Sequence, residues 1–150
     1  WLTFVDGMQN MEIMHNVINA GMLKHESGSE YGYVVFDKNI AVGRNTLHKV
    51  DMRNRSAEIG YWLIPSDLSK GLITNSTKAL LKFAFSELGL NRIEIRCGVR
   101  NLKSQKIPDQ LGFHREGIMR DGEWLNGKFH DLIINSLLKS DYEQMISKNE

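Results

Sequence analysis

The stretch 57–88 constrains the fold most, because it passes from a strand to a helix through one short polar loop. Residues 57–63 read Ala-Glu-Ile-Gly-Tyr-Trp-Leu, a mixture of apolar and aromatic side chains that predicts a strand. Pro65 should end this strand, since proline has no N–H for a ladder. A helix is predicted over 71–88, and Gly89 suits the left-handed residue that closes a helix.

The predicted helix has one apolar face, because residues three and four apart lie on the same side of a helix. The apolar face carries Ile73, Leu80, Leu81, Ala84, Phe85 and Leu88, with Thr77 among them, and the opposite face carries Asn75, Lys78, Lys82 and Ser86.

The loop before this helix, residues 66–71, is a candidate phosphate site. A helix N-terminus presents unpaired backbone N–H groups at the positive end of the helix dipole, which suits a phosphate or pyrophosphate. Most strand–loop–helix turns bind nothing, so this pattern leaves a phosphate site and an ordinary turn both open.

The rest of the chain alternates between helical and strand periodicity. The predicted elements are a helix at 6–24, strands at 31–36, 40–47 and 57–63, a helix at 71–88, a strand at 91–99, a helix at 101–111 and strands at 113–120 and 128–138, with polar connections at 49–55 and 121–127 and a polar tail from Lys139. This order predicts one α/β domain, residues 1–150, whose sheet is mixed and largely antiparallel.

Two of the predicted helices have features that bear on packing. The first carries an apolar stripe that we expect to pack in the core rather than to bind a ligand, namely Met11, Met14, Val17, Ile18 and Met22. The helix at 101–111 should begin at Asn101 as its N-cap and end at Gly112. Pro108 has no N–H to donate to the Ser104 carbonyl, so this helix should be loosened there.

Composition limits the location and the partners. A net charge of +1 gives no bulk attraction to nucleic acid or to an anionic membrane. The single cysteine, Cys97, excludes an internal disulfide, and a cytoplasmic location is the default expectation. No apolar run approaches the ~20 residues that span a membrane. Residue 1 is Trp rather than Met, so we expect the chain to be processed, cut or incompletely represented at its N-terminus.

No metal site is expected. One cysteine cannot complete a zinc site, and the histidines show no metal-ligand spacing: His15, His25, His48, His114 and His130. The run from Gly122 to Lys128 nearly spells a P-loop, but Phe129 replaces the required Ser or Thr and a strand follows, so this motif is rejected.

Three side chains remain as candidates for chemistry. Glu58, on the strand before the loop, is either a general base or a solvent-facing carboxylate. Ser104, just beyond a strand, is either a catalytic hydroxyl or an ordinary polar residue of a first helical turn. Cys97 is expected to be a small buried apolar residue rather than a nucleophile.

Taken together, the motifs resemble the GNAT acyltransferase superfamily and, within it, the ribosomal-protein N-terminal acetyltransferases of the RimJ/RimL type. The resemblance runs in order from about residue 31 to 139. It rests on Ala57-Glu-Ile-Gly-Tyr-Trp-Leu63, Lys70-Gly-Leu-Ile-Thr74, Leu88-Gly-Leu-Asn-Arg-Ile-Glu-Ile-Arg96, Asn101-x-x-Ser104, Leu111-Gly-Phe113, Gly117-Ile-Met-Arg120, Trp124-Leu-Asn-Gly127 and His130-Asp131 through Ser136-Leu-Leu138.

The resemblance implies a GNAT-like sheet that splays beside strand 57–63, with acetyl-CoA as cosubstrate and no metal. In such a site the backbone of Trp62, Leu63 and Ile64 would serve the pantetheine amides and the thioester, Asn101 would bond the pantetheine arm, and the pyrophosphate would lie on Ser69, Lys70, Gly71, Leu72 and Ile73. Ser104 would protonate the leaving thiolate, and Glu58, through water, would take the proton of the amine.

Two departures from the family pattern have consequences. Leu68 stands where the pyrophosphate loop usually has Gln or Arg, and Ser69 stands at a position that is often Gly. Since the loop acts mainly through backbone N–H groups, cofactor binding should be weakened rather than abolished. The family's opening strand is also missing before the first predicted helix.

The implied acceptor is an amine, and the pKa of that amine helps to decide which class of amine it is. An α-amino group has a pKa near 7.7–8.0 against about 10.4 for lysine, which favours a protein N-terminus at neutral pH. A small amine such as a polyamine or an antibiotic stays open as the acceptor, and so does a module that binds acyl-CoA without turnover. Neither nucleic acid nor membrane is implied as a partner, and a homodimer is left open.

Overall fold

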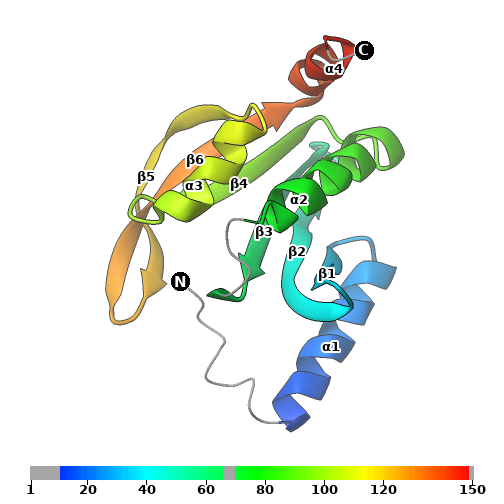
Figure 1. The fold of residues 1–150 in the computed structure, drawn as a ribbon, viewed down its shortest axis with the longest axis vertical. Helices are drawn as coiled ribbons and strands as arrows, with labels where there is room; N and C mark the ends of the chain where they lie inside the picture. The colour runs from blue at the N-terminus through cyan, green and yellow to red at the C-terminus, as the bar shows by residue number, and fades with distance from the viewer. Residues whose placement is uncertain (1–10, 66–69, 149–150) are drawn as a thin grey trace.

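The computed structural model describes residues 11–65 and 70–148. In chain order its elements are α1 (Met11–Glu26), β1 (Tyr31–Asp37), β2 (Ile40–Asp51), β3 (Ser56–Leu63), α2 (Leu72–Lys82), η3 (Phe83–Glu87), β4 (Arg92–Gly98), α3 (Leu102–Gln110), β5 (His114–Leu125), β6 (Lys128–Leu138) and α4 (Lys139–Ser147). Figure 1 shows one twisted sheet with α2 and α3 in front of it.

The six strands lie in the order β1-β2-β3-β4-β6-β5. β3 and β4 are parallel, and the other neighbouring pairs are antiparallel, so the predicted mixed, largely antiparallel sheet is confirmed. The parallel pairing joins residues 56–58 to residues 92–94 and then stops. Beyond these residues β3 and β4 diverge, and we call this opening in the middle of the sheet the splay.

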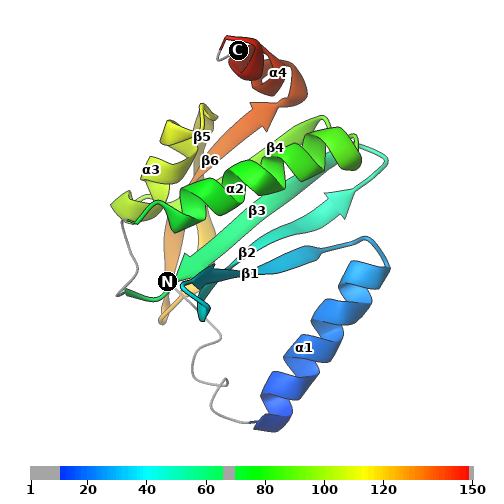
Figure 2. The same ribbon diagram turned by 45° about the vertical axis from the view of Figure 1, so that its right-hand side comes forward.

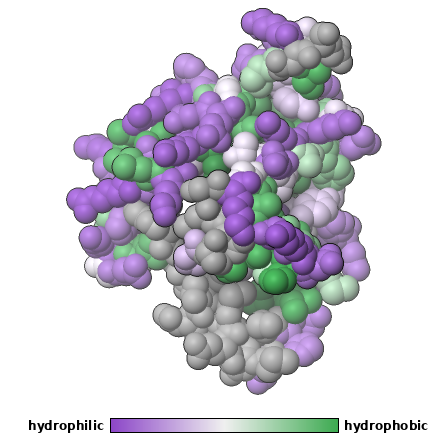
Figure 3. Space-filling model, in the orientation of Figure 1, coloured by the Kyte–Doolittle hydropathy of each residue, from purple (hydrophilic) through white to green (hydrophobic). Residues whose placement is uncertain are grey.

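The core lies between the sheet and helix α2 with its continuation η3. Thr77 and Leu80 are buried, as the predicted apolar face requires, and Phe85 extends that face into η3. η3 is a π-helical turn in which the Leu88 N–H donates to the Phe83 carbonyl, so the helix predicted over 71–88 widens at its end. This face packs on strand residues that include Leu47, Ala57, Ile59, Ile93, Ile95 and Leu137. Figure 3 shows hydrophilic side chains over much of the outer surface above α2 and α3.

Both polar connections that the sequence predicts are partly wrong, because strands extend into them. β2 continues to Asp51, and β5 continues to Leu125 before Asn126 and Gly127 turn the chain into β6. These two residues have φ of 51° and 76°, which is typical of the two-residue turn favoured by Asn-Gly. The β5 pairing shifts between Met119 and Glu123, and this irregular stretch has the polar composition of a loop.

The polar tail from Lys139 forms helix α4, which the periodicity did not predict. The Leu138 N–H donates to the Asp141 carboxylate at the start of the helix, at 3.3 Å. Tyr142 lies against Phe85 with ring centroids 4.9 Å apart, and Met145 also packs on the core. Tertiary contacts therefore stabilise a helix whose own composition is mostly polar.

Helix α1 lies beside β1 and apart from the layered body (Figures 1 and 2). The prediction that its apolar stripe packs in the core is wrong for Val17, Ile18 and Met22, which are 45%, 54% and 58% exposed. Among the described side chains, the end of the helix packs on β1, where the His25 ring meets Tyr31.

The start of the chain falls outside the described residues. Residues 6–10 of the first predicted helix lie there, the side chains of Met11 and Met14 are likewise not described, and the prediction of a missing opening strand stays a prediction. None of the described helices is long and apolar enough to cross a membrane.

Candidate active site

A cavity of about 470 Å³ occupies the splay. Its wall includes Glu58, Trp62, Leu63, Ile73, Asn101 and Ser104 from the predicted site. Ile64, Lys70 and Gly71 are not part of that wall, and Leu72 lines a second cavity between β1 and α2 instead. Ser69 lies outside the described residues. The structure therefore brings both predicted catalytic side chains to one cavity, with part of the predicted cofactor-binding set.

The backbone of β3 has a free edge beside the cavity. The Ile64 N–H donates to the Val42 carbonyl at 2.8 Å and so faces β2. Because backbone groups alternate in direction along a strand, the N–H groups of Tyr61 and Leu63 face the splay. Gly43 permits the close approach of β2 at this point, since a Cβ there would clash with the Trp62 carbonyl oxygen.

The N-terminus of α2 follows Gly71, whose φ of 75° is the left-handed conformation that glycine adopts without strain. The first-turn N–H groups of Leu72 and Ile73 have no acceptor within the helix. Among the described residues, no side chain caps this end and accepts them instead. Lys70 lies just before them, with its Nζ 2.8 Å from an Asp37 carboxylate oxygen. Free N–H groups and a nearby cation fit a phosphate.

Helix α3 positions Asn101 and Ser104 on the other side of the cavity. The Asn101 Oδ1 accepts the Ser104 backbone N–H at 3.2 Å, so the predicted N-cap is confirmed. This bond uses the carbonyl of the Asn101 side chain and leaves its NH₂ group for another acceptor.

Sequence patterns do not single out Tyr61, yet it contacts Ser104 directly. The Ser104 hydroxyl lies 3.3 Å from the Tyr61 hydroxyl and 3.4 Å from Cys97 Sγ. Cys97 is 3% exposed, as expected for a small core residue. Burial raises the pKa of its thiol, so Cys97 stays protonated rather than becoming a thiolate.

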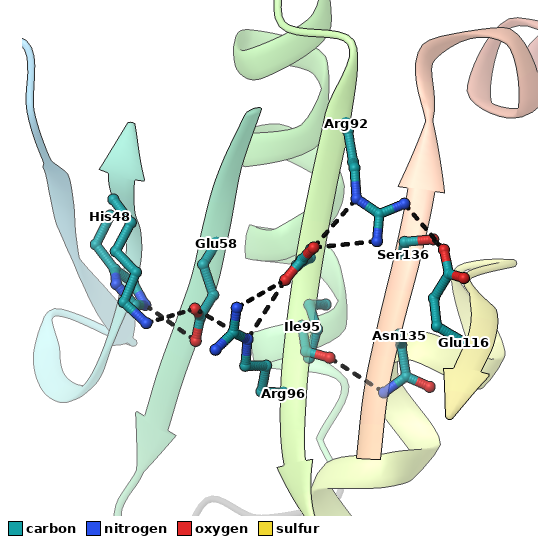
Figure 4. Close-up of polar contacts among 10 residues, drawn as sticks. His48, Glu58, Arg92, Ile95, Arg96, Glu116, Asn135 and Ser136 are labelled. Atoms are coloured by element: carbon teal, nitrogen blue, oxygen red, sulfur yellow. Dashed lines mark hydrogen bonds and ion pairs between the residues drawn. The ribbon is translucent and has the colours of Figure 1, made fainter. Parts of the chain in front are cut away.

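Glu58 faces the side of the sheet away from α2, because it alternates with the core residue Ala57. Its carboxylate lies 2.8 Å from Lys49 Nζ, 3.3 Å from Arg96 Nε and 3.8 Å from His48 Nε2. Figure 4 shows Arg96 reaching from β4 towards Glu58 on β3. Arg96 therefore links the two strands at the point where their backbone pairing stops.

Ion pairs continue from Arg96 across the sheet to β5. Arg96 and Arg92 both bind the Glu94 carboxylate at 3.0 Å, and Arg92 also lies 2.9 Å from Glu116. Ser136 donates to the same Glu116 carboxylate at 2.6 Å. Burial raises the pKa of Glu94, but hydrogen bonds from Arg96 and Arg92 outweigh it and hold that pKa below its usual value. The carboxylates on this face are thus neutralised by neighbouring cations.

Glu123, on β5, is a second carboxylate in the cavity wall, and Lys103 is a second cation. In the part of the chain that the structure describes, Glu123 forms no ion pair. It is absent from the predicted site because residues 121–127 have the composition of a loop, although the Asn126-Gly127 turn signal could have extended the strand through it. No described residues form a cluster of three or more metal-ligating side chains.

Comparison with known proteins agrees with this arrangement. Residues 4–114 match the family model described as an acetyltransferase (GNAT) domain. The chain is 38% identical over 146 residues to the putative ribosomal N-acetyltransferase YdaF of Bacillus subtilis (strain 168), covering 95% of this chain and 79% of YdaF. It is also 29% identical over 122 residues to a spermidine N(1)-acetyltransferase of Vibrio cholerae, covering 79% and 70% of the two chains.

The fold extends the comparison to a solved structure with coenzyme A. RimL, a ribosomal L7/L12 α-N-protein acetyltransferase in complex with coenzyme A, aligns with a TM-score of 0.88 and 27% identity, covering 94% of this chain and 79% of RimL. The chain therefore belongs to the GNAT acetyltransferase family and is an acetyl-transferring enzyme.

Proposed function

We propose that this acetyltransferase transfers the acetyl group of acetyl-CoA to the α-amino group of a protein N-terminus, as in ribosomal-protein acetylation. The cavity in the splay carries the proposal, because a free β3 edge, Asn101, Ser104 and Glu58 all border it. The names of YdaF and RimL, both related to ribosomal-protein acetylation, support the protein acceptor.

The proposed donor site uses backbone groups for most of its contacts. The open edge of β3 at Leu63 offers an N–H to the thioester carbonyl, and Trp62 and Ile64 flank it. Asn101 offers its side-chain NH₂ to the pantetheine arm. The pyrophosphate would lie on the loop and first turn formed by Ser69, Lys70, Gly71, Leu72 and Ile73, where backbone N–H groups and the Lys70 cation favour an anion.

In the proposed reaction the amine nitrogen attacks the thioester carbonyl carbon, so that a C–N bond forms and the C–S bond breaks. A backbone donor on the carbonyl oxygen is worth about 3 kcal/mol in comparable sites. Ser104 gives its proton to the departing sulfur and regains one from water. Glu58, through water, takes the proton that the amine loses, and general acid–base steps of this kind contribute about 10²–10⁴-fold.

The charge of the cavity favours an N-terminus over a polyamine. Two acidic side chains, Glu58 and Glu123, and two basic ones, Arg96 and Lys103, line it. A polycationic acceptor would gain from an excess of carboxylates, and the described residues of this wall show none. An α-amino group, by contrast, needs about 3.5 kcal/mol less than a lysine amine to become neutral at a given pH.

The acceptor is tested by measuring thiol release from acetyl-CoA with a panel of amines. Peptides with free N-termini should be acetylated, and the same peptides with blocked N-termini and an internal lysine are the matched controls. Faster turnover with spermidine or an aminoglycoside would overturn the proposed acceptor class. Binding of CoA without thiol release from any member would instead identify a non-catalytic acyl-CoA-binding module.

The proposed residue roles are tested on single variants. Ser104→Ala should lower turnover by about 10²-fold and change the affinity for acetyl-CoA by less than about tenfold. Glu58→Gln should lower turnover and steepen its dependence on pH, with Glu123→Gln as the matched carboxylate control. Loss of turnover in Glu123→Gln alone would assign the base to Glu123 instead.

A further inference from the structure

The backbone carbonyl of Ser104 lacks its normal helical partner. In an α-helix it would accept the N–H of residue 108, but that residue is Pro108, which has none. The Tyr61 hydroxyl takes this place, donating to the Ser104 carbonyl at 3.0 Å. A side chain of β3 therefore supplies the hydrogen bond that α3 cannot make for itself.

The same hydroxyl also contacts the Ser104 side chain. Because the single proton of Tyr61 points to the carbonyl, its oxygen can accept the Ser104 Oγ proton, at 3.3 Å, until that hydroxyl turns to the leaving sulfur. Cys97 Sγ, at 3.4 Å, is an alternative acceptor for the same proton. Burial, with a smaller contribution from Cys97, raises the pKa of the Tyr61 phenol, so Tyr61 keeps this proton throughout the physiological range. Two hydrogen bonds thus connect one side chain of β3 to one residue of α3.

This connection crosses the cavity wall. Tyr61, Ser104 and Leu63 all border the same cavity, and Tyr61 is only two residues from Leu63 along β3. A fixed distance between Tyr61 and Ser104 therefore also fixes the Ser104 hydroxyl relative to the free edge of β3.

We propose that Tyr61 is a positioning residue for Ser104, holding the first turn of α3 and the Ser104 hydroxyl in register with the free edge of β3. This inference rests on the proposed role of Ser104 as proton donor to the leaving sulfur. Pro108 contributes to this positioning, because its missing N–H leaves the Ser104 carbonyl available to the Tyr61 hydroxyl.

The test measures kcat, the KM for acetyl-CoA, calorimetric CoA affinity and thermal unfolding in matched variants. Tyr61→Phe removes only the hydroxyl and should lower kcat by about fivefold or more, with CoA affinity changed by less than about threefold. Tyr33→Phe removes a hydroxyl on exposed β1 and should retain wild-type kcat. Adding Pro108→Ala to Tyr61→Phe restores a helical N–H to the Ser104 carbonyl, so the unfolding midpoint should rise back towards the wild-type value.

A double-mutant cycle decides whether Tyr61 acts through Ser104. In the Ser104→Ala background, Tyr61→Phe should cause no further fall in kcat. An equal fall in both backgrounds, or an unchanged kcat in Tyr61→Phe while Ser104→Ala is impaired, would overturn the positioning role. Wild-type kcat in Ser104→Ala would instead refute the proposed function of Ser104, so the two failures are distinguishable.

Discussion

His48 is half-buried on β2 beside Glu58, and its environment opposes a positive charge. Burial lowers the pKa of its imidazole below the usual value, and Lys49 and Lys24 act in the same direction. Glu58 and Glu30 act in the opposite direction without cancelling the effect. A neutral His48 leaves Lys49 and Arg96 as the main cations on Glu58.

The lowered pKa of His48 predicts a pH dependence of stability. Below its ordinary value of 6.5 the unfolded chain takes up the proton before the folded one, so the free energy of unfolding should fall as pH drops. The difference between wild type and His48→Gln, measured by urea unfolding from pH 7.5 to 5.5, isolates this contribution. A difference that stays constant over this interval would contradict the prediction.

At the scale of elements, the site is assembled from the ends of three elements that differ in what they offer. β3 offers a backbone edge that β4 does not pair, α2 offers first-turn N–H groups that no described side chain caps, and α3 offers side chains from its capped end. Lys70, beside the end of α2, already pairs with Asp37 at the turn between β1 and β2. A phosphate on this loop would therefore compete with Asp37 for the same cation.

The N-terminus of α2 predicts tighter binding of CoA than of pantetheine. Charge-assisted hydrogen bonds contribute about 1.5–3 kcal/mol each, so calorimetry should give at least a tenfold higher affinity for CoA. Asp37→Asn should increase that preference, because it removes one carboxylate that competes with the phosphate for Lys70. Equal affinity for CoA and pantetheine would rule out the phosphate cradle.

At the scale of the whole molecule, the two faces of the sheet differ in composition, and the splay is open to both. One face packs its apolar residues under α2, and the other carries the ion pairs that run from Lys49 to Glu116 (Figure 4). The cavity wall contains residues of both faces, with Tyr61 from the first and Arg96 from the second. Two substrates could thus reach a common opening from opposite sides of the sheet.

Because the cavity lies in the middle of the sheet, we predict that bound CoA stabilises the entire fold. A ligand that binds only the folded state at 100 times its Kd adds about 2.7 kcal/mol, so the unfolding midpoint should rise with CoA concentration. Because no three metal-ligating side chains cluster among the described residues, the shift and the rate of acetyl transfer should be unchanged by EDTA. Activity that is lost with the chelator and restored by zinc would contradict the metal-free reaction.

The sequence by itself determined the local features of the site. The buried face of α2, the cap at Asn101, the freed Ser104 carbonyl and the left-handed Gly89, with φ of 64°, all follow from residues a few positions apart. Periodicity and the covalent properties of glycine and proline act over that range. The motif order also identified the family, and with it part of the cavity wall, namely Glu58, Trp62, Leu63, Ile73, Asn101 and Ser104, but not Tyr61 or Glu123.

Only the tertiary structure decided which distant residues meet. Tyr61 and Ser104 are 43 positions apart, and Arg96 reaches Glu58 only because β3 and β4 are neighbours whose pairing stops at this point. Whether Val17, Ile18 and Met22 of α1 are buried or exposed likewise depends on which elements lie beside that helix. Periodicity states which side chains share a face, but long-range strand order and packing determine whether that face is covered and by what.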